Sequence, residues 1–68
     1  MKVEEAKAIL KSDIHTLSTI IPATENIEQL LLRKRHLEAR KLILKTYETV
    51  NPESEIIVAD FDLLITLN

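Results

Sequence analysis

The sequence contains no cysteine, no glycine and no tryptophan, and it has only one phenylalanine and one tyrosine. Without cysteine no disulfide can form, which removes one common means of stabilising a small domain. Without glycine the chain cannot build a phosphate-binding loop of the P-loop or dinucleotide type, because such loops need glycine for close backbone approach. Two-residue β-hairpins also favour Asn-Gly or Gly-X pairs, and the sequence offers neither.

Long hydrophobic runs are also absent, since no apolar stretch exceeds four residues. A membrane-spanning helix needs about 20 apolar residues. Lys2 is followed closely by Glu4 and Glu5, without the apolar stretch of a secretory signal. We therefore expect a soluble, cytoplasmic protein with no membrane segment.

The length of 68 residues predicts a single domain over 1–68. A chain of this size buries only about 60% of the surface that its unfolded form exposes. Hydrophobic residues make up 46% of the chain, so an aliphatic core is expected. With so small a core, regular helix packing or oligomerisation is expected to supply additional stability.

Charge is distributed unevenly along the chain. Residues 33–50 carry six basic and two acidic side chains, for a net charge of +4. Residues 51–68 carry four acidic side chains and no basic one, for a net charge of −4. This division predicts that the acidic tail packs against the basic segment of its own chain or of a second copy.

Apolar spacing predicts one helix over residues 2–21, which Pro22 ends because the residue before proline avoids helical angles. Ser12 and Asp13 compete for local backbone bonds, but we expect the helix to continue through them. Thr24 is the expected N-cap of a second helix over residues 24–50. Neither predicted helix contains an internal glycine or proline.

The second helix has an unusually wide apolar face. At about 100° per residue, two apolar ridges run along it, one through Leu32, Ala39, Ile43, Tyr47 and Val50 and the other through Leu30, Leu37 and Leu44. Arg33 and Arg40 lie between the ridges. One neighbouring helix cannot cover this face, so two neighbours are required: the first helix and either the tail or a second chain.

The tail fits two patterns. Asn51 and Pro52 resemble a helix start and favour a third helix over residues 52–66. The apolar residues at alternate positions from Ile57 onward instead favour a strand over residues 55–66. Such a strand has no partner within the chain and would pair across a dimer, giving an α+β fold. We favour the helix, and with it an all-α three-helix bundle, because the chain can then close its core alone.

The tail acids are the expected partners of the helix arginines. Arg33 and Arg40 are predicted to reach out of the apolar seam, with Asp60 the best placed acid. The predicted surface for a protein partner or a second copy comprises Leu30, Arg33, Leu37, Arg40, Leu44, Asp60, Phe61 and Leu64.

The basic residues of the second helix suggest an alternative, which is nucleic-acid binding through Lys34, Arg35, Lys41 and Lys45. Consecutive helical residues point in different directions, however, and Glu38 dilutes the cluster. Aromatic side chains that could stack on bases are almost absent. Solvent-exposed helix surface therefore remains the simpler interpretation of these residues.

No other motif predicts chemistry. Asp60 and Asp62 would share a side only in a strand, where they could hold a hard cation. His15 and His36 lie on different predicted helices without metal-ligand spacing, and no serine has a histidine base at a recognisable spacing. We expect no metal, no cofactor and no catalytic activity. The sequence favours a small regulatory protein-binding module, such as an adaptor, inhibitor or assembly subunit, that forms a homodimer or binds a larger protein.

Overall fold

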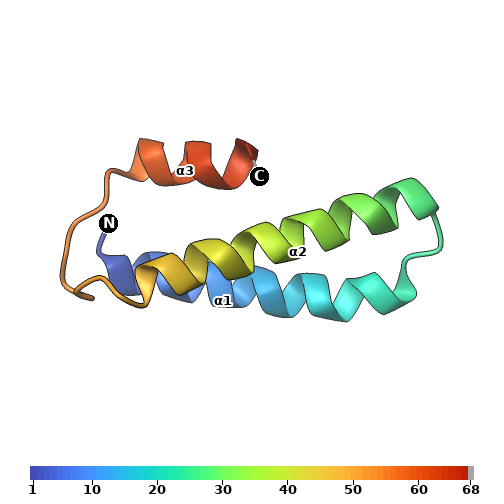
Figure 1. Ribbon diagram of the computed structural model, residues 1–68, viewed down its shortest axis with the longest axis horizontal. Coiled ribbons are helices and arrows are strands. Elements are labelled where there is room, and N and C mark those ends of the chain that lie inside the picture. The colour runs from blue at the N-terminus through green and yellow to red at the C-terminus, as the bar shows by residue number, and fades with distance from the viewer. Residues whose placement is uncertain (68) are drawn as a thin grey trace.

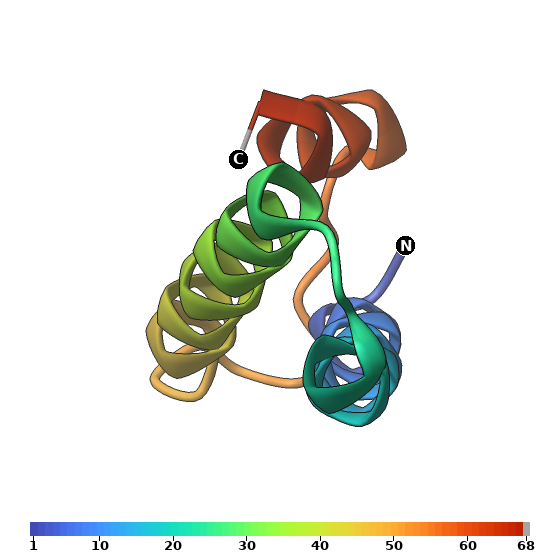
Figure 2. The ribbon, with the colours of Figure 1, turned by 90° about the vertical axis from the view of Figure 1, so that its right-hand side faces the viewer.

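A computed structural model describes residues 1–66 in full and the backbone of residue 67. Its three α-helices are α1 (Val3–Ile20), α2 (Ile27–Tyr47) and α3 (Val58–Leu67), and a short 3₁₀ turn, η1 (Ile21–Ala23), joins the first two. Helices α1 and α2 form an antiparallel hairpin, and α3 lies along the half of it that holds the N-terminus (Figure 1). Viewed end-on, the three helices occupy the corners of a triangle (Figure 2). The predicted three-helix, all-α fold is confirmed.

The turn between α1 and α2 differs in detail from the prediction. Helix α1 runs unbroken through Ser12 and Asp13, as predicted, and η1 contains Pro22. The Thr24 hydroxyl donates to the Ile20 carbonyl at 2.7 Å, so Thr24 closes the end of α1 and does not cap α2. The N-cap of α2 is Asn26, whose Oδ1 accepts from the Gln29 amide at 3.0 Å. Helix α2 consequently spans 27–47 and is shorter than the predicted 24–50.

The third helix starts at Val58, six residues later than predicted, and no strand forms over 55–66. Residues 51–54 instead form a turn, and the segment that follows runs beside the N-terminus, where Glu55 bridges to Lys2. The carbonyls of Ser54 and Pro52 accept from the amides of Val3 and Glu4, at 2.9 and 3.1 Å. Amides in the first turn of a helix have no partner within that helix. Satisfying those of α1 holds this segment against the N-terminus, which is why a helix does not begin at Pro52.

Two tail acids also pair with the start of the chain. Glu53 accepts from Lys2 Nζ at 2.9 Å, and Glu55 lies 3.1 Å from the amino group of Met1. The hydrogen bond to Glu53 raises the pKa of Lys2 above its ordinary value. The prediction that the tail acids pair with the basic helix is therefore wrong for these two residues.

The core is confined to the half of the hairpin that α3 covers. Val3, Ala6, Leu10 and Phe61 are buried, and the half-buried side chains packed on this core include Leu44, Tyr47 and Ile65. The radius of gyration is 12.9 Å, against about 11 Å for a compact domain of this length. The accessible surface is 4872 Å², against roughly 4,400 Å² expected from its mass. Helix α3 is shorter than both helices of the hairpin and covers only part of its length.

Candidate protein-interaction surface

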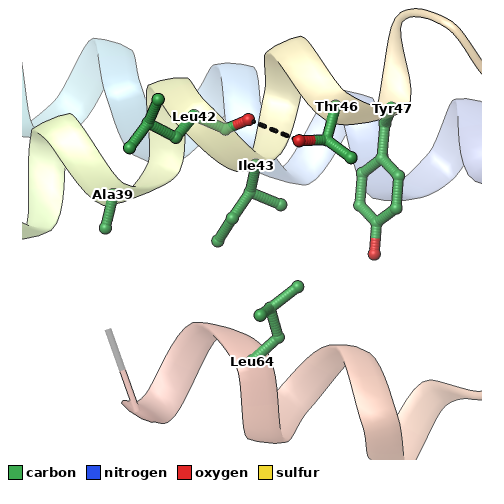
Figure 3. A pocket seen from close by; sticks show the side chains of 6 residues that line it. All are labelled: Ala39, Leu42, Ile43, Thr46, Tyr47 and Leu64. Carbon is green, nitrogen blue, oxygen red and sulfur yellow. Dashed lines mark hydrogen bonds between the residues drawn. The ribbon is translucent and has the colours of Figure 1, made fainter.

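An apolar groove opens between α2 and α3. It has a volume of about 360 Å³ and is lined by Ala39, Leu42, Ile43, Thr46, Tyr47 and Leu64. Five of these residues come from two and a half turns of α2, and Leu64 faces them from α3 (Figure 3). The Thr46 hydroxyl donates to the Leu42 carbonyl at 3.0 Å. Because that bond occupies the threonine hydroxyl, the groove presents a mainly apolar lining.

The groove is open to water at its edges. The exposed fractions are 67% for Leu42 and 37% for Leu64, and Leu32, two turns before Ala39, is 45% exposed. Burying a leucine side chain is worth about 1.5–3 kcal/mol. Covering this strip with another apolar surface would therefore be favourable. On monomeric proteins exposed leucines are usually scattered singly, and a continuous strip of them is uncommon.

The helical repeat explains why this face is uncovered. Ala39, Ile43 and Tyr47 follow one another at four-residue spacing along the α2 side nearest α3, whereas Leu42 lies further round the helix. Helix α3 has only ten residues. It covers Tyr47 through Phe61, whose ring centroid lies 6.2 Å from that of Tyr47. Leu42 and Leu32 are thus left outside the bundle.

Arg40 lies at the junction of all three helices, and its side chain is only 12% exposed. Its Nε donates to Asp13 of α1 and its Nη2 to the Ile65 carbonyl of α3, both at 3.4 Å. Ile65 lies in the last turn of α3, where a cation interacts favourably with the helix dipole. Arg40 therefore meets the tail as predicted, but through a backbone carbonyl. The predicted Arg40–Asp60 pair is wrong, and Asp60 is exposed.

Nη1 of Arg40 is buried and has no partner among the described residues. On the α1 side, Asp13, Thr16, Leu17, His36 and Arg40 line a second, smaller hollow of about 230 Å³. Arg33, two turns nearer the hairpin turn, donates to the Thr24 hydroxyl. Both arginines thus make bonds within the chain.

The structure separates the residues predicted for partner binding. Phe61 is 1% exposed and belongs to the core of this chain, and Leu44 packs on the same cluster. Leu30 and Leu37 are half-buried on α2. Leu64 lies in the groove and Asp60 is exposed one turn before it. Of the eight residues, these last two lie on the uncovered face.

The basic residues proposed for nucleic-acid contact are all exposed. Lys41 lies 3.8 Å from Glu38, while Lys34, Arg35 and Lys45 pair with no side chain in the part of the chain that is described. Helical spacing places Arg35 on the arc of Leu42, away from Lys34 and Lys41. Arg35 is therefore separate from the strip of lysines, and the four residues do not form one patch.

Sequence reasoning missed Leu42 and Thr46. Leu42 stands between Lys41 and an apolar ridge and belongs to neither of the two ridges that predict the core. The signal that could have found it is its spacing from Ala39 and Thr46, at three and four residues, which places all three on one arc.

Over residues 1–67, no helix is long and apolar enough to cross a membrane. The same residues contain no cluster of three or more histidine, cysteine or carboxylate side chains suited to a metal ion. Comparison of the chain with protein-family models, with curated protein sequences and with solved structures gives no match.

Proposed function

We propose that this protein is a small non-catalytic interaction module, an adaptor, inhibitor or assembly subunit, that acts by packing helices against itself or against a larger cytoplasmic protein. The observation that carries the proposal is the apolar groove between α2 and α3, with Leu42 exposed at its edge. A groove flanked by helices is a common way to receive another helix, whose apolar side chains enter it at three- and four-residue spacing.

The extent of the uncovered apolar surface supports this function. Among the side chains of residues 1–66, ten large hydrophobic ones are exposed by more than a third. Several lie on α2 and α3 around the groove, the most exposed of them Leu42. The buried core of these described residues is small, so this much apolar surface favours a role in which a partner covers it.

Site-specific photo-cross-linking tests the proposal while the identity of the partner is still open. A benzophenone amino acid replaces Leu42 in one variant and Leu31 in another, and each is expressed and irradiated in cells. Leu31 is 62% exposed and lies on nearly the same arc of α2, three turns from Leu42 and outside the groove. The two positions are therefore matched in helix, chemistry and exposure.

We expect position 42 to give discrete higher-mass adducts with a protein and position 31 to give far fewer. Mass spectrometry then identifies the adduct as a second copy or as another protein. Equal yields at the two positions, or no adduct at position 42, would contradict the assignment of the groove.

Nucleic-acid binding remains the alternative function, favoured by the exposure of Lys34, Arg35 and Lys45 without acidic partners among the described residues. A gel-shift series in rising salt tests it, because each phosphate contact adds to the salt dependence of binding. Binding that weakens steeply with salt and is lost in a Lys34→Glu/Lys45→Glu variant supports this alternative. Absence of binding at low salt removes it.

A further inference from the structure

The groove carries opposite charges at its two ends. On α2, Arg35 lies one turn before Ala39 and on the arc that includes Leu42. On α3, Asp60 lies one turn before Leu64. Helix α3 runs antiparallel to α2 (Figure 1), so one turn back along α3 leads toward the Tyr47 end of the groove. The basic group therefore lies beyond one end of the groove and the acidic group toward the other.

Both charged groups are available to a partner. Arg35 and Asp60 are exposed, and neither pairs with a side chain of residues 1–66. Two other tail acids, Glu53 and Glu55, pair with Lys2 and the Met1 amino group, and Asp62 lies on another side of α3. Asp60 is thus the tail acid that remains beside the groove.

We infer that the groove is covered by the same groove of a second copy, related to the first by a twofold axis perpendicular to the helices. The inference rests on the proposed function and names its partner. A twofold rotation reverses the direction of the groove, so the Arg35 end of each copy meets the Asp60 end of the other. A self-complementary patch of this kind is what a symmetric dimer requires, and it forms two ion pairs at once.

A dimer of this kind would cover a moderate share of the molecular surface. A stable interface buries about 600–1,000 Å² on each partner. The molecule exposes 4872 Å², so the interface would cover roughly an eighth to a fifth of it. In that arrangement the partner covers both Leu42 and Leu64 of each copy, and both side chains leave water.

Charge exchange tests the arrangement directly. Sedimentation equilibrium compares the full chain with Arg35→Asp, with Asp60→Arg and with an equal mixture of the two variants. Each variant alone brings like charges together twice, so its dimer should dissociate with a constant raised by about tenfold or more. In the mixture one copy is basic and the other acidic at both positions. The heterodimer should regain the affinity of the unsubstituted chain.

Asp62→Arg provides the matched control, because it makes the same change of charge two residues away on another side of α3. It should leave dimerisation unchanged. Circular dichroism checks that each variant is folded. If a charge-reversal variant does not fold, its neutral counterpart replaces it: Arg35→Gln for Arg35→Asp, or Asp60→Asn for Asp60→Arg. These neutral variants should each weaken the dimer by a smaller factor.

The inference is overturned if the unsubstituted chain is monomeric at all concentrations. It is also overturned if the mixture of Arg35→Asp and Asp60→Arg associates no better than either variant alone. If the chain is monomeric but position 42 cross-links to another protein, the second copy is excluded and the interaction module stands. If position 42 gives no adduct and the chain is monomeric, both proposals fail.

Discussion

Replacing Phe61 with alanine should release α3 from the hairpin. Phe61 is a buried side chain of α3, at 1% exposure, and it packs on Ala6 and Leu10 of α1. Truncating a buried phenylalanine costs about 3–5 kcal/mol. A 68-residue domain has a total stability of roughly 3–10 kcal/mol. The substitution therefore removes a large share of the free energy of unfolding.

The released helix should also lose its structure. Isolated helices shorter than about 12–15 residues are marginal in water, and α3 has 10 residues, against 18 in α1 and 21 in α2. Release of α3 should therefore lower the far-ultraviolet helical signal by about a fifth. Tyr47 provides a local probe, because its ring lies 6.2 Å from that of Phe61 and the chain has no tryptophan.

Urea unfolding, followed by circular dichroism and by tyrosine fluorescence at one fixed protein concentration, measures both effects. Fixing the concentration matters because association raises apparent stability. Leu63→Ala is the control: it lies on the same helix, it is 58% exposed, and it should change stability by less than about 0.5 kcal/mol. If Phe61→Ala shows the midpoint and tyrosine signal of the unsubstituted chain, Phe61 does not hold α3.

Three further substitutions test other parts of the structure by the same unfolding measurement. Arg40→Met should leave stability unchanged or raise it by about 1 kcal/mol, because it removes a buried, incompletely paired guanidinium while Asp13, at 40% exposure, stays hydrated; a loss above about 2 kcal/mol would contradict this. Asn26→Ala should cost about 1 kcal/mol by removing the N-cap of α2, and an unchanged midpoint would assign the cap elsewhere. Leu37→Asp places a charge in the half-buried α1–α2 seam and should cost at least about 2 kcal/mol. Full retention of stability would place Leu37 outside that seam.

Local patterns predicted the helical hairpin well, because the apolar spacing and Pro22 lie in or beside the helices whose presence and ends they determine. The start of α3 could not be predicted in this way. Asn51 and Pro52 carry the signals of a helix start, but their segment pairs with the backbone of residues 1–4, more than 45 positions away. Asn51 Oδ1 instead accepts from the Glu53 amide at 2.9 Å, as in a turn. The competing contact is nonlocal, and no window of sequence contains it.

The candidate site, too, was predicted from sequence only as far as local patterns determine it. The width of the apolar face on α2 indicated that two neighbours were needed, and the structure supplies α1 and a short α3. Which part of the face α3 leaves uncovered depends on where α3 starts and on how far its ten residues reach. Leu64 and Asp60 were identified from sequence, whereas Leu42 and Thr46 were not, because their position depends on that placement.

The charge division found in the sequence has two roles in the folded chain. Glu53 and Glu55 hold the segment before α3 against the start of the chain and so set where α3 can begin. That placement leaves Asp60 exposed beside the groove, while Arg35 stays exposed beyond its opposite end. If Asp60 paired with Arg40 inside the bundle, only the Arg35 end of the groove would be charged, and the groove would not favour one orientation of a partner by opposite charges. Because Arg40 is already held by Asp13 and the Ile65 carbonyl, both ends of the groove remain charged, and a partner surface with the reverse order of charges is favoured.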